Sequence, residues 1–238
     1  MKKGLWRVNG ETIIFNKSGE LSNGQHRLSA CVEANTPFLA IVLCNVDDDA
    51  FATIDTGKIR SGGDVLYLSG VEKYSNKYSS IITRYLGKES SVASLLRSEN
   101  ARKYGVSKTE IKDFYLEHKE LLDDIVPFAC RLHDKNHLLT HGTIGSLIMV
   151  LILDYKWDVT LVKDFFEKLF NGNSEISSIK LLYNILVKHS NKTDIKTNNQ
   201  IICYFVKAWN AYVRNDEISV IRAGKDEKVP QILYCENN

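Results

Sequence analysis

Asn23-Gly24-Gln25-His26-Arg27 is the stretch that decides the fold of the N-terminal part of this chain. A short strand-like segment precedes these residues, and a helix-like segment follows them. A glycine at a strand-to-helix turn lets the backbone approach a ligand closely. The start of the helix offers free amides and a partial positive charge, and an imidazole and a guanidinium add charge-assisted donors. Together these features predict a phosphate site.

The residues on either side of this turn predict a small sheet. Residues 10–24 have the pattern of a β-hairpin, with turn chemistry at Asn16–Gly19. The helix that follows is expected to end near Asn35, because the proline two residues later disfavours its continuation. The apolar run Phe38–Cys44 has the length and composition of a strand that is buried on both faces.

The sheet region is expected to end in a short helix and a glycine-rich loop. Asp47–Asp49 suits a helix start, because the acids favour the helix dipole and one of them can cap. Three glycines mark residues 55–63 as a loop, and Asp64 is expected to cap a helix over 65–68. Residues 1–70 are therefore expected to form a compact unit of strands and helices.

The rest of the chain has helical periodicity. The segments expected to be helical are 73–86, 90–103, 107–126, 141–155, 158–170, 177–189 and 194–214. Ser107 and Glu110 have capping-box spacing, and residues 217–221 have the composition of a short strand. The predicted fold class is α+β, with a small mixed domain over residues 1–70 followed by an all-helical domain over residues 71–238.

The composition is that of an ordinary globular protein. The 238 residues are 44% hydrophobic and 25% charged, and the formal net charge is +2. The near-neutral balance gives no general argument for nucleic-acid binding, although it leaves room for a local basic patch. The five scattered cysteines argue against a disulfide framework and a zinc site, so a reducing cytoplasm is the expected compartment. No signal peptide is visible and no apolar run is long enough to span a bilayer, so no membrane association is expected.

The turn sequence resembles a known signature. Asn23-Gly24-Gln25-His26-Arg27 is similar to the Asp-Gly-Gln-His-Arg signature of the ParB/sulfiredoxin superfamily and differs from it only at Asn23. The resemblance covers about the first 70 residues, and the remainder looks like the helical extension of phage-encoded ParB-like proteins. Proteins that regulate DNA phosphorothioation carry the most similar form of the signature, which implies a process related to nucleic acids.

The resemblance implies roles for individual residues. In sulfiredoxins a Gly-Cys-His-Arg motif holds nucleotide phosphates, and Gly24, His26 and Arg27 match it. Gln25 occupies the position of the catalytic cysteine, so sulfinic acid reduction is not expected. In ParB proteins a Gly-Glu-Arg-Arg motif contacts the triphosphate of CTP, and only Gly24 and Arg27 match that form. The structural alternative is a plain turn in which His26 bonds a carbonyl and Arg27 pairs with Glu33 or with Asp55 of the following loop.

A second cluster of polar residues lies in that loop. The ammonium group of Lys58 can bind a phosphate as a point charge, and the guanidinium of Arg60 can bind it through two hydrogen bonds. Thr56 and Ser61 can donate hydrogen bonds to phosphate oxygens. Asp55 can hold Mg²⁺ or act as a base. An Asp-x-Gly-x-x-Arg stretch occupies this position in the phage proteins that the chain resembles. The alternative is a glycine-rich loop with solvated charges.

Two further groups of residues have a structural and a functional interpretation. His133, His137 and His141 recur at helical spacing and allow a metal site, but the residues between them suggest a helix break. Trp209 can stack on a base or pack in a core, and core packing is the expected role in an apolar-periodic helix.

The sequence therefore predicts a protein that binds a nucleoside triphosphate, ATP or CTP, at the Gly24–Arg27 turn. If it is catalytic, it hydrolyses the nucleotide or transfers a phosphoryl group, with His26 as phosphate donor or acid/base group and Asp55 as Mg²⁺ ligand or base. The alternatives are a non-catalytic DNA-binding or regulatory module and a phage accessory protein that binds a host partner. Related chains are expected to carry a longer N-terminal segment, and neither base preference nor oligomeric state can be deduced from the sequence.

Overall fold

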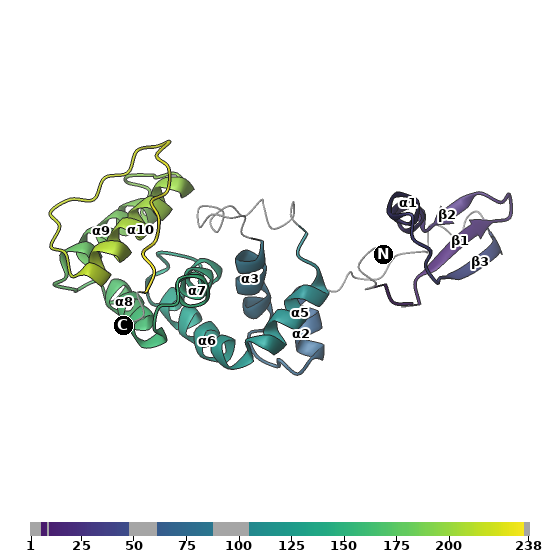
Figure 1. Ribbon diagram of the computed structural model, residues 1–238, viewed down its shortest axis with the longest axis horizontal. Helices are drawn as coiled ribbons and strands as arrows, with labels where there is room; N and C mark the ends of the chain where they lie inside the picture. Colours follow the sequence, from purple (N-terminus) through teal and green to yellow (C-terminus); the bar gives the residue numbers. More distant parts are fainter. Residues whose placement is uncertain (1–5, 9, 48–60, 88–104, 236–238) are drawn as a thin grey trace. The chain divides into compact units, whose positions relative to one another are not determined.

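A run of β-branched and aromatic residues forms the central strand of a small sheet near the start of the chain. Strand β1 (Thr12–Asn16) pairs antiparallel with β2 (Leu21–Asn23) and parallel with β3 (Ile41–Val46), so the strand order is β2-β1-β3 (Figure 1). Helix α1 (Gln25–Ala34) connects β2 to β3. The predicted hairpin is confirmed, and so is a helix that ends at Asn35.

This sheet belongs to the first of two structural units. The computed structural model describes residues 6–8, 10–47, 61–87 and 105–235, and it divides the chain into units of residues 1–59 and 60–238. The sequence places the boundary near residue 70, whereas α2 (Gly62–Leu68) packs on helices of the second unit. The helix expected after Asp47–Asp49 and the helix expected over 90–103 lie outside the described residues.

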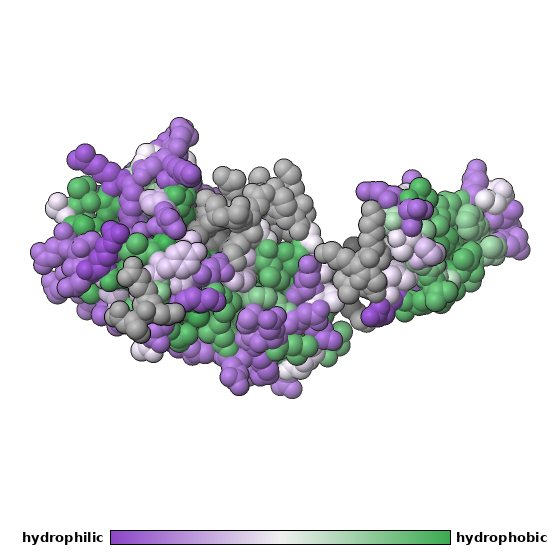
Figure 2. Space-filling view, in the orientation of Figure 1, coloured by the Kyte–Doolittle hydropathy of each residue, from purple (hydrophilic) through white to green (hydrophobic). Residues whose placement is uncertain are grey.

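The prediction that Phe38–Cys44 is a strand buried on both faces is wrong. The strand begins at Ile41, and its apolar side chains Ile41, Val42 and Leu43 are 44%, 52% and 45% exposed. β3 also lies at an edge of the sheet, where it pairs only with β1 among the described strands. Figure 2 shows the resulting apolar surface in green in the region of the strands. A continuous apolar run therefore indicates a strand but not that its faces are covered.

The second unit is helical and follows the predicted periodicity closely. Its remaining described α-helices are α3 (Ser75–Leu86), α5 (Lys108–Glu117), α6 (Lys119–Asn136), α7 (His141–Met149), α8 (Val159–Asn171), α9 (Ser177–Ser190) and α10 (Asn198–Arg214). Local capping explains several of the starts. The side chains that accept a first-turn amide are those of Ser61, Ser107, Thr140, Asp158 and Thr197.

Several boundaries differ from the predictions, among them the start of α10, which begins at Asn198 and not at residue 194. The helix expected over 107–126 is divided at His118, and α6 then continues through Pro127 to Asn136. Apolar spacing continues across the break, so periodicity gives no sign of it. The helix expected over 141–155 ends in a π-helical turn, η3 (Val150–Asp154), in which the amide of Tyr155 bonds the carbonyl of Val150.

Two smaller predictions also need correction. Ser61 is the cap of α2, and Asp64 closes the capping box from the third helical position instead of capping the helix itself. Residues 217–221 form no strand and belong to a C-terminal strap, residues 216–235, that runs along α10. The strap is held by side chains of α10 that bond its backbone, so it has no need of a strand partner.

Close helix contacts and buried tyrosines hold the helical unit together. A Cβ atom at Gly145 would lie only 2.4 Å from Cδ1 of Ile81, so α7 can approach α3 this closely only with glycine. Three tyrosine hydroxyls bond carboxylates on other elements, and burial and these bonds raise the pKa of each tyrosine. The bonds join Tyr78 to Asp123, Tyr85 to Asp154 and Tyr212 to Asp164.

The core of this unit centres on aromatic residues of α8 and α10. Phe165 is fully buried, and its ring lies 5.1 Å from the ring of Trp209 and 5.9 Å from that of Phe205. Trp209 is also fully buried, which confirms its expected packing role. Among the described residues no helix combines the length and the apolar character needed to cross a bilayer.

Replacing Phe165 with alanine should lower the free energy of unfolding of the helical unit by about 3–5 kcal/mol, because a buried aromatic ring leaves a cavity. Urea unfolding followed by circular dichroism at the helix band measures this change. Tyr67→Ala is the matched control, since Tyr67 is 58% exposed, and its cost should stay below about 0.5 kcal/mol. Equal effects of the two substitutions would contradict this assignment of the core.

Candidate functional site

Gly24 fixes the turn between β2 and α1. Its φ of 108° lies in the region that favours glycine. A Cβ atom there would lie 3.0 Å from Cγ1 and 3.3 Å from Cα of Ile13, which is a buried residue of β1. Both the backbone conformation and the lack of space therefore require glycine, as the sequence pattern suggests.

The first turn of α1 is open. No side chain caps it and it contains no acidic residue. The first helical hydrogen bond runs from the amide of Leu28 to the carbonyl of Gly24, so the amides of Gln25, His26 and Arg27 precede the helical ladder. The side chains of Gln25 and His26 are exposed. The start of α1 therefore has free amides and exposed polar side chains, which are features that an anion-binding turn requires.

Arg27 has a different position from the one expected. Its Nη1 donates to the carbonyl of Glu11 at 2.7 Å, and its Nη2 donates to the carbonyl of Thr12 at 2.8 Å. The guanidinium therefore ties α1 to the start of β1. Among the described residues no carboxylate pairs with Arg27, Glu33 included. Arg27 thus supports the turn and adds positive potential to it.

The second predicted cluster is described only at its end. Asp55, Thr56, Lys58 and Arg60 lie outside the described residues. The hydroxyl of Ser61 accepts from the amide of Asp64 at 3.1 Å and donates to Oδ2 of Asp64 at 2.9 Å. Ser61 therefore has a structural role as a helix cap, which competes with the predicted role of phosphate donor.

The histidines that recur at helical spacing, His133, His137 and His141, do lie close together. The ring of His133 is 4.7 Å from the ring of His137 and 5.8 Å from that of His141, in edge-on orientations. Nδ1 of His133 lies 2.9 Å from the carbonyl oxygen of Leu139. In the described part of the chain, no group of three or more His, Cys, Asp or Glu side chains is arranged to hold a metal.

The surroundings of His141 disfavour its charged form. Burial lowers the pKa of His141 below its usual 6.5, and the nearby charges of Lys77, His133 and Arg84 lower it further, against a smaller opposing effect of Asp134. Imidazoles pack here with two cationic side chains, so protonation of His141 at acidic pH should weaken the packing of α3, α6 and α7.

Sequence reasoning missed two features of the molecule. The first is the pair of hydrogen bonds from Arg27 to the carbonyls of Glu11 and Thr12. Residue types do not reveal such partners, since every residue has a backbone carbonyl. A pocket of about 630 Å³ lies beside the end of α10 and was not anticipated. Its only signal in the sequence is that charged residues bracket the apolar positions Ile218–Ile221.

Comparisons with known proteins add no family assignment. No family model matches the chain, and neither a search of curated proteins nor a search of solved structures found a match.

The substitution Arg27→Lys should loosen the N-terminal unit, because an ammonium group cannot bond two carbonyls as the guanidinium fork does. Loss of a charged hydrogen bond costs about 1.5–3 kcal/mol. Hydrogen exchange of the β1 amides should accelerate accordingly. Glu33→Gln, on an exposed position of the same helix, should leave the exchange rates unchanged. Unchanged exchange in Arg27→Lys would show that the two bonds do not hold the turn.

The stability of the helical unit should fall as the pH drops below about 6.5. The folded state holds the pKa of His141 below the unfolded value, so the unfolded chain binds more protons in this window and stability is lost as the pH decreases. Urea midpoints measured between neutral and acidic pH should show a smaller decline in His141→Gln than in the wild type. His26→Gln, in the other unit, is the control. A parallel decline in wild type and His141→Gln would contradict this account.

Proposed function

We propose that the N-terminal unit binds the phosphates of a nucleoside triphosphate at the Gly24 turn, as the resemblance to the ParB/sulfiredoxin superfamily implies. The observation that supports this proposal best is the open first turn of α1, which follows a glycine with positive φ and contains no acidic residue. The free amides of this turn are available to an anion.

The proposal gives each residue of the turn a role. The amides of Gln25 and His26 hold a phosphate, and the exposed imidazole of His26 and the side-chain amide of Gln25 donate to it. Arg27 positions the turn through Glu11 and Thr12 and contributes its charge at a distance. This assignment differs from the sequence prediction, in which the guanidinium of Arg27 donates directly to the phosphate.

The proposal keeps the phosphate-binding roles that the sequence predicts for the loop after β3, which lies outside the described residues. Lys58 and Arg60 are proposed as further phosphate-binding cations, and Thr56 as a hydroxyl donor. Asp55 is proposed to hold Mg²⁺ or to act as a base, which would permit hydrolysis or phosphoryl transfer with His26 as acid/base group. ATP and CTP are the nucleotides to test first.

A specific observation also favours a second function, that of a regulatory module with a protein partner. The edge strand β3 presents Ile41, Val42 and Leu43, each more than 40% exposed. Exposed apolar strands at sheet edges are typical of surfaces that pair with another chain. This function is compatible with nucleotide binding, since the Gly24 turn follows the opposite edge strand β2.

Calorimetric titration of the full chain with ATP, CTP, GTP and UTP, each with and without Mg²⁺, tests the proposal. At least one triphosphate should bind, and its nucleoside should not, because the phosphates supply the contacts. His26→Ala should weaken binding about 5- to 20-fold, as expected for one lost charge-assisted bond. Ser29→Ala, an exposed position further along α1, is the control and should change nothing.

Two results would contradict the proposal. One is the absence of binding for every triphosphate at millimolar concentration, and the other is equal affinity in wild type and His26→Ala. Phosphate release by the wild type and by Asp55→Ala then separates hydrolysis from binding alone. Arg27 variants are unsuitable here, because they also disturb the fold of the turn.

A further inference from the structure

The C-terminal strap is pinned to α10 by bonds to its backbone. Gln200 donates to the carbonyl of Ala223 at 3.0 Å, and Lys207 donates to the carbonyl of Arg222 at 2.6 Å. Asn210 donates to the carbonyl of Gln231 at 2.9 Å. Before these points the amide of Ile218 bonds the hydroxyl of Ser177, the first residue of α9. The strap therefore arches between the anchors at Ile218 and Arg222.

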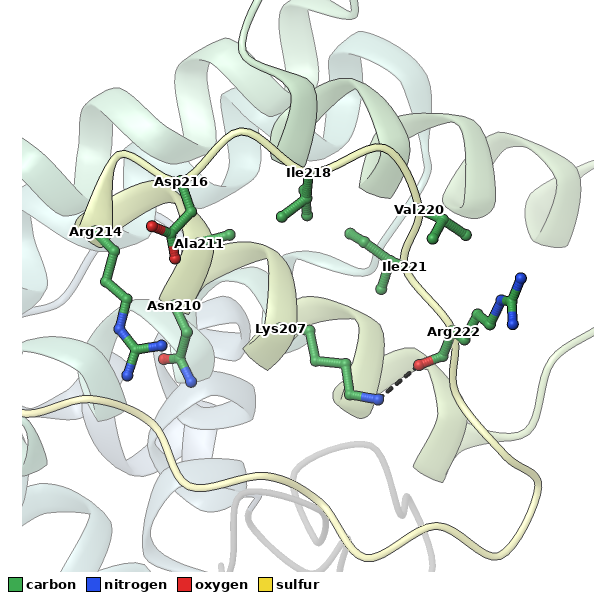
Figure 3. Close-up of a pocket in the computed structure, with 9 residues that line it drawn as sticks. All are labelled: Lys207, Asn210, Ala211, Arg214, Asp216, Ile218, Val220, Ile221 and Arg222. Carbon is green, nitrogen blue, oxygen red and sulfur yellow. Dashed lines mark hydrogen bonds between the residues drawn. The ribbon is translucent and has the colours of Figure 1, made fainter.

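A pocket of about 630 Å³ lies between this arch and the last two turns of α10. Figure 3 places Ile218 and Ile221 in the middle of the pocket, with Arg214 and Arg222 at its opposite ends. Ligand pockets for small molecules have volumes of roughly 300–1,000 Å³ and combine an apolar body with a few polar groups. The pocket has both properties.

The charged groups of the pocket leave an excess of positive charge. Its lining contains the cations Lys207, Arg214 and Arg222 and the single carboxylate of Asp216. The amine of Lys207 is already paired with Glu227 at 2.5 Å. Within the part of the chain that the structure describes, the side chains of Arg214, Arg222 and Asp216 have no hydrogen-bond or ion-pair partner. The lining therefore contains two available guanidinium groups and one available carboxylate.

We infer that this pocket binds a small amphipathic organic anion, with its apolar body on Ile218 and Ile221 and its carboxylate on the arginine at one end, Arg214 or Arg222. Guanidinium groups bind carboxylates through paired hydrogen bonds, and the apolar floor excludes water from one side of the ligand. The same chemistry is offered by a free aliphatic acid and by an acidic residue next to an apolar one in a peptide. The pocket belongs to the helical unit, so this inference does not depend on nucleotide binding at Gly24.

Octanoate is the probe for a free acid, and n-octanol is its uncharged counterpart. Titration of the ¹⁵N-labelled full chain with octanoate should shift amides of residues 207–222 in a saturable way. Octanol should bind at least about fivefold more weakly, because it cannot pair with a guanidinium group. A capped peptide with adjacent leucine and glutamate residues forms the second arm. Tighter binding of the peptide than of octanoate would identify a peptide segment as the source of the anion.

Four variants test the inference, because some should weaken octanoate binding and one should tighten it. Arg214→Gln or Arg222→Gln, whichever removes the guanidinium that binds the carboxylate, should weaken octanoate binding about three- to tenfold, whereas Asp216→Asn should tighten it by up to about fivefold. Lys225→Gln is the matched control, since Lys225 is an exposed strap cation outside the lining, and it should have little effect. A variant that misfolds would weaken binding but would not tighten it.

Three results would overturn the inference. They are the absence of saturable shifts in residues 207–222 with either anion at tens of millimolar, equal binding of octanoate and octanol, and unchanged affinity in both arginine variants. If Asp216→Asn weakens binding, the proposed charge balance of the pocket is wrong.

Discussion

The contact of Gly24 with Ile13 is the constraint on which the N-terminal unit depends. A side chain at position 24 would meet Ile13 within 3.0 Å, and the φ of 108° excludes most other residues. This contact brings the start of α1 against the central strand, which lets Arg27 reach the carbonyls of Glu11 and Thr12. One small residue therefore sets both the direction of α1 and the exposure of its first amides.

The two units are stabilised by different kinds of interaction. The described N-terminal sheet buries few apolar residues, among them Ile13 and Ile14, and depends on turn geometry and on the Arg27 bonds. The helical unit has a large core around Phe165 and Trp209, and its C-terminal strap is fastened by polar side chains of α10. Small cores contribute little stability, so single polar substitutions should have their largest effect on the free energy of unfolding in the first unit.

The sequence predicted those parts that local chemistry determines. The Ser107 capping box, the Asn35 helix end and the turn at Gly24 each follow from one or two residue types at fixed positions. The break at His118 and the exposure of β3 could not be predicted, because they depend on how elements pack and not on apolar spacing. At the candidate site the sequence located the open helix start correctly. It could not assign Arg27, because backbone carbonyl partners leave no pattern in the sequence.

The central claim is that the amides of Gln25 and His26 bind phosphate. Amide chemical shifts of ¹⁵N-labelled protein during titration with ATP and with CTP measure this most directly. The account predicts large, saturable shifts for Gln25 and His26 with at least one nucleotide, and negligible shifts for Val32 and Glu33 at the other end of α1. Shifts at Gln25 and His26 no larger than those at Val32 and Glu33, with both nucleotides in excess, would contradict it.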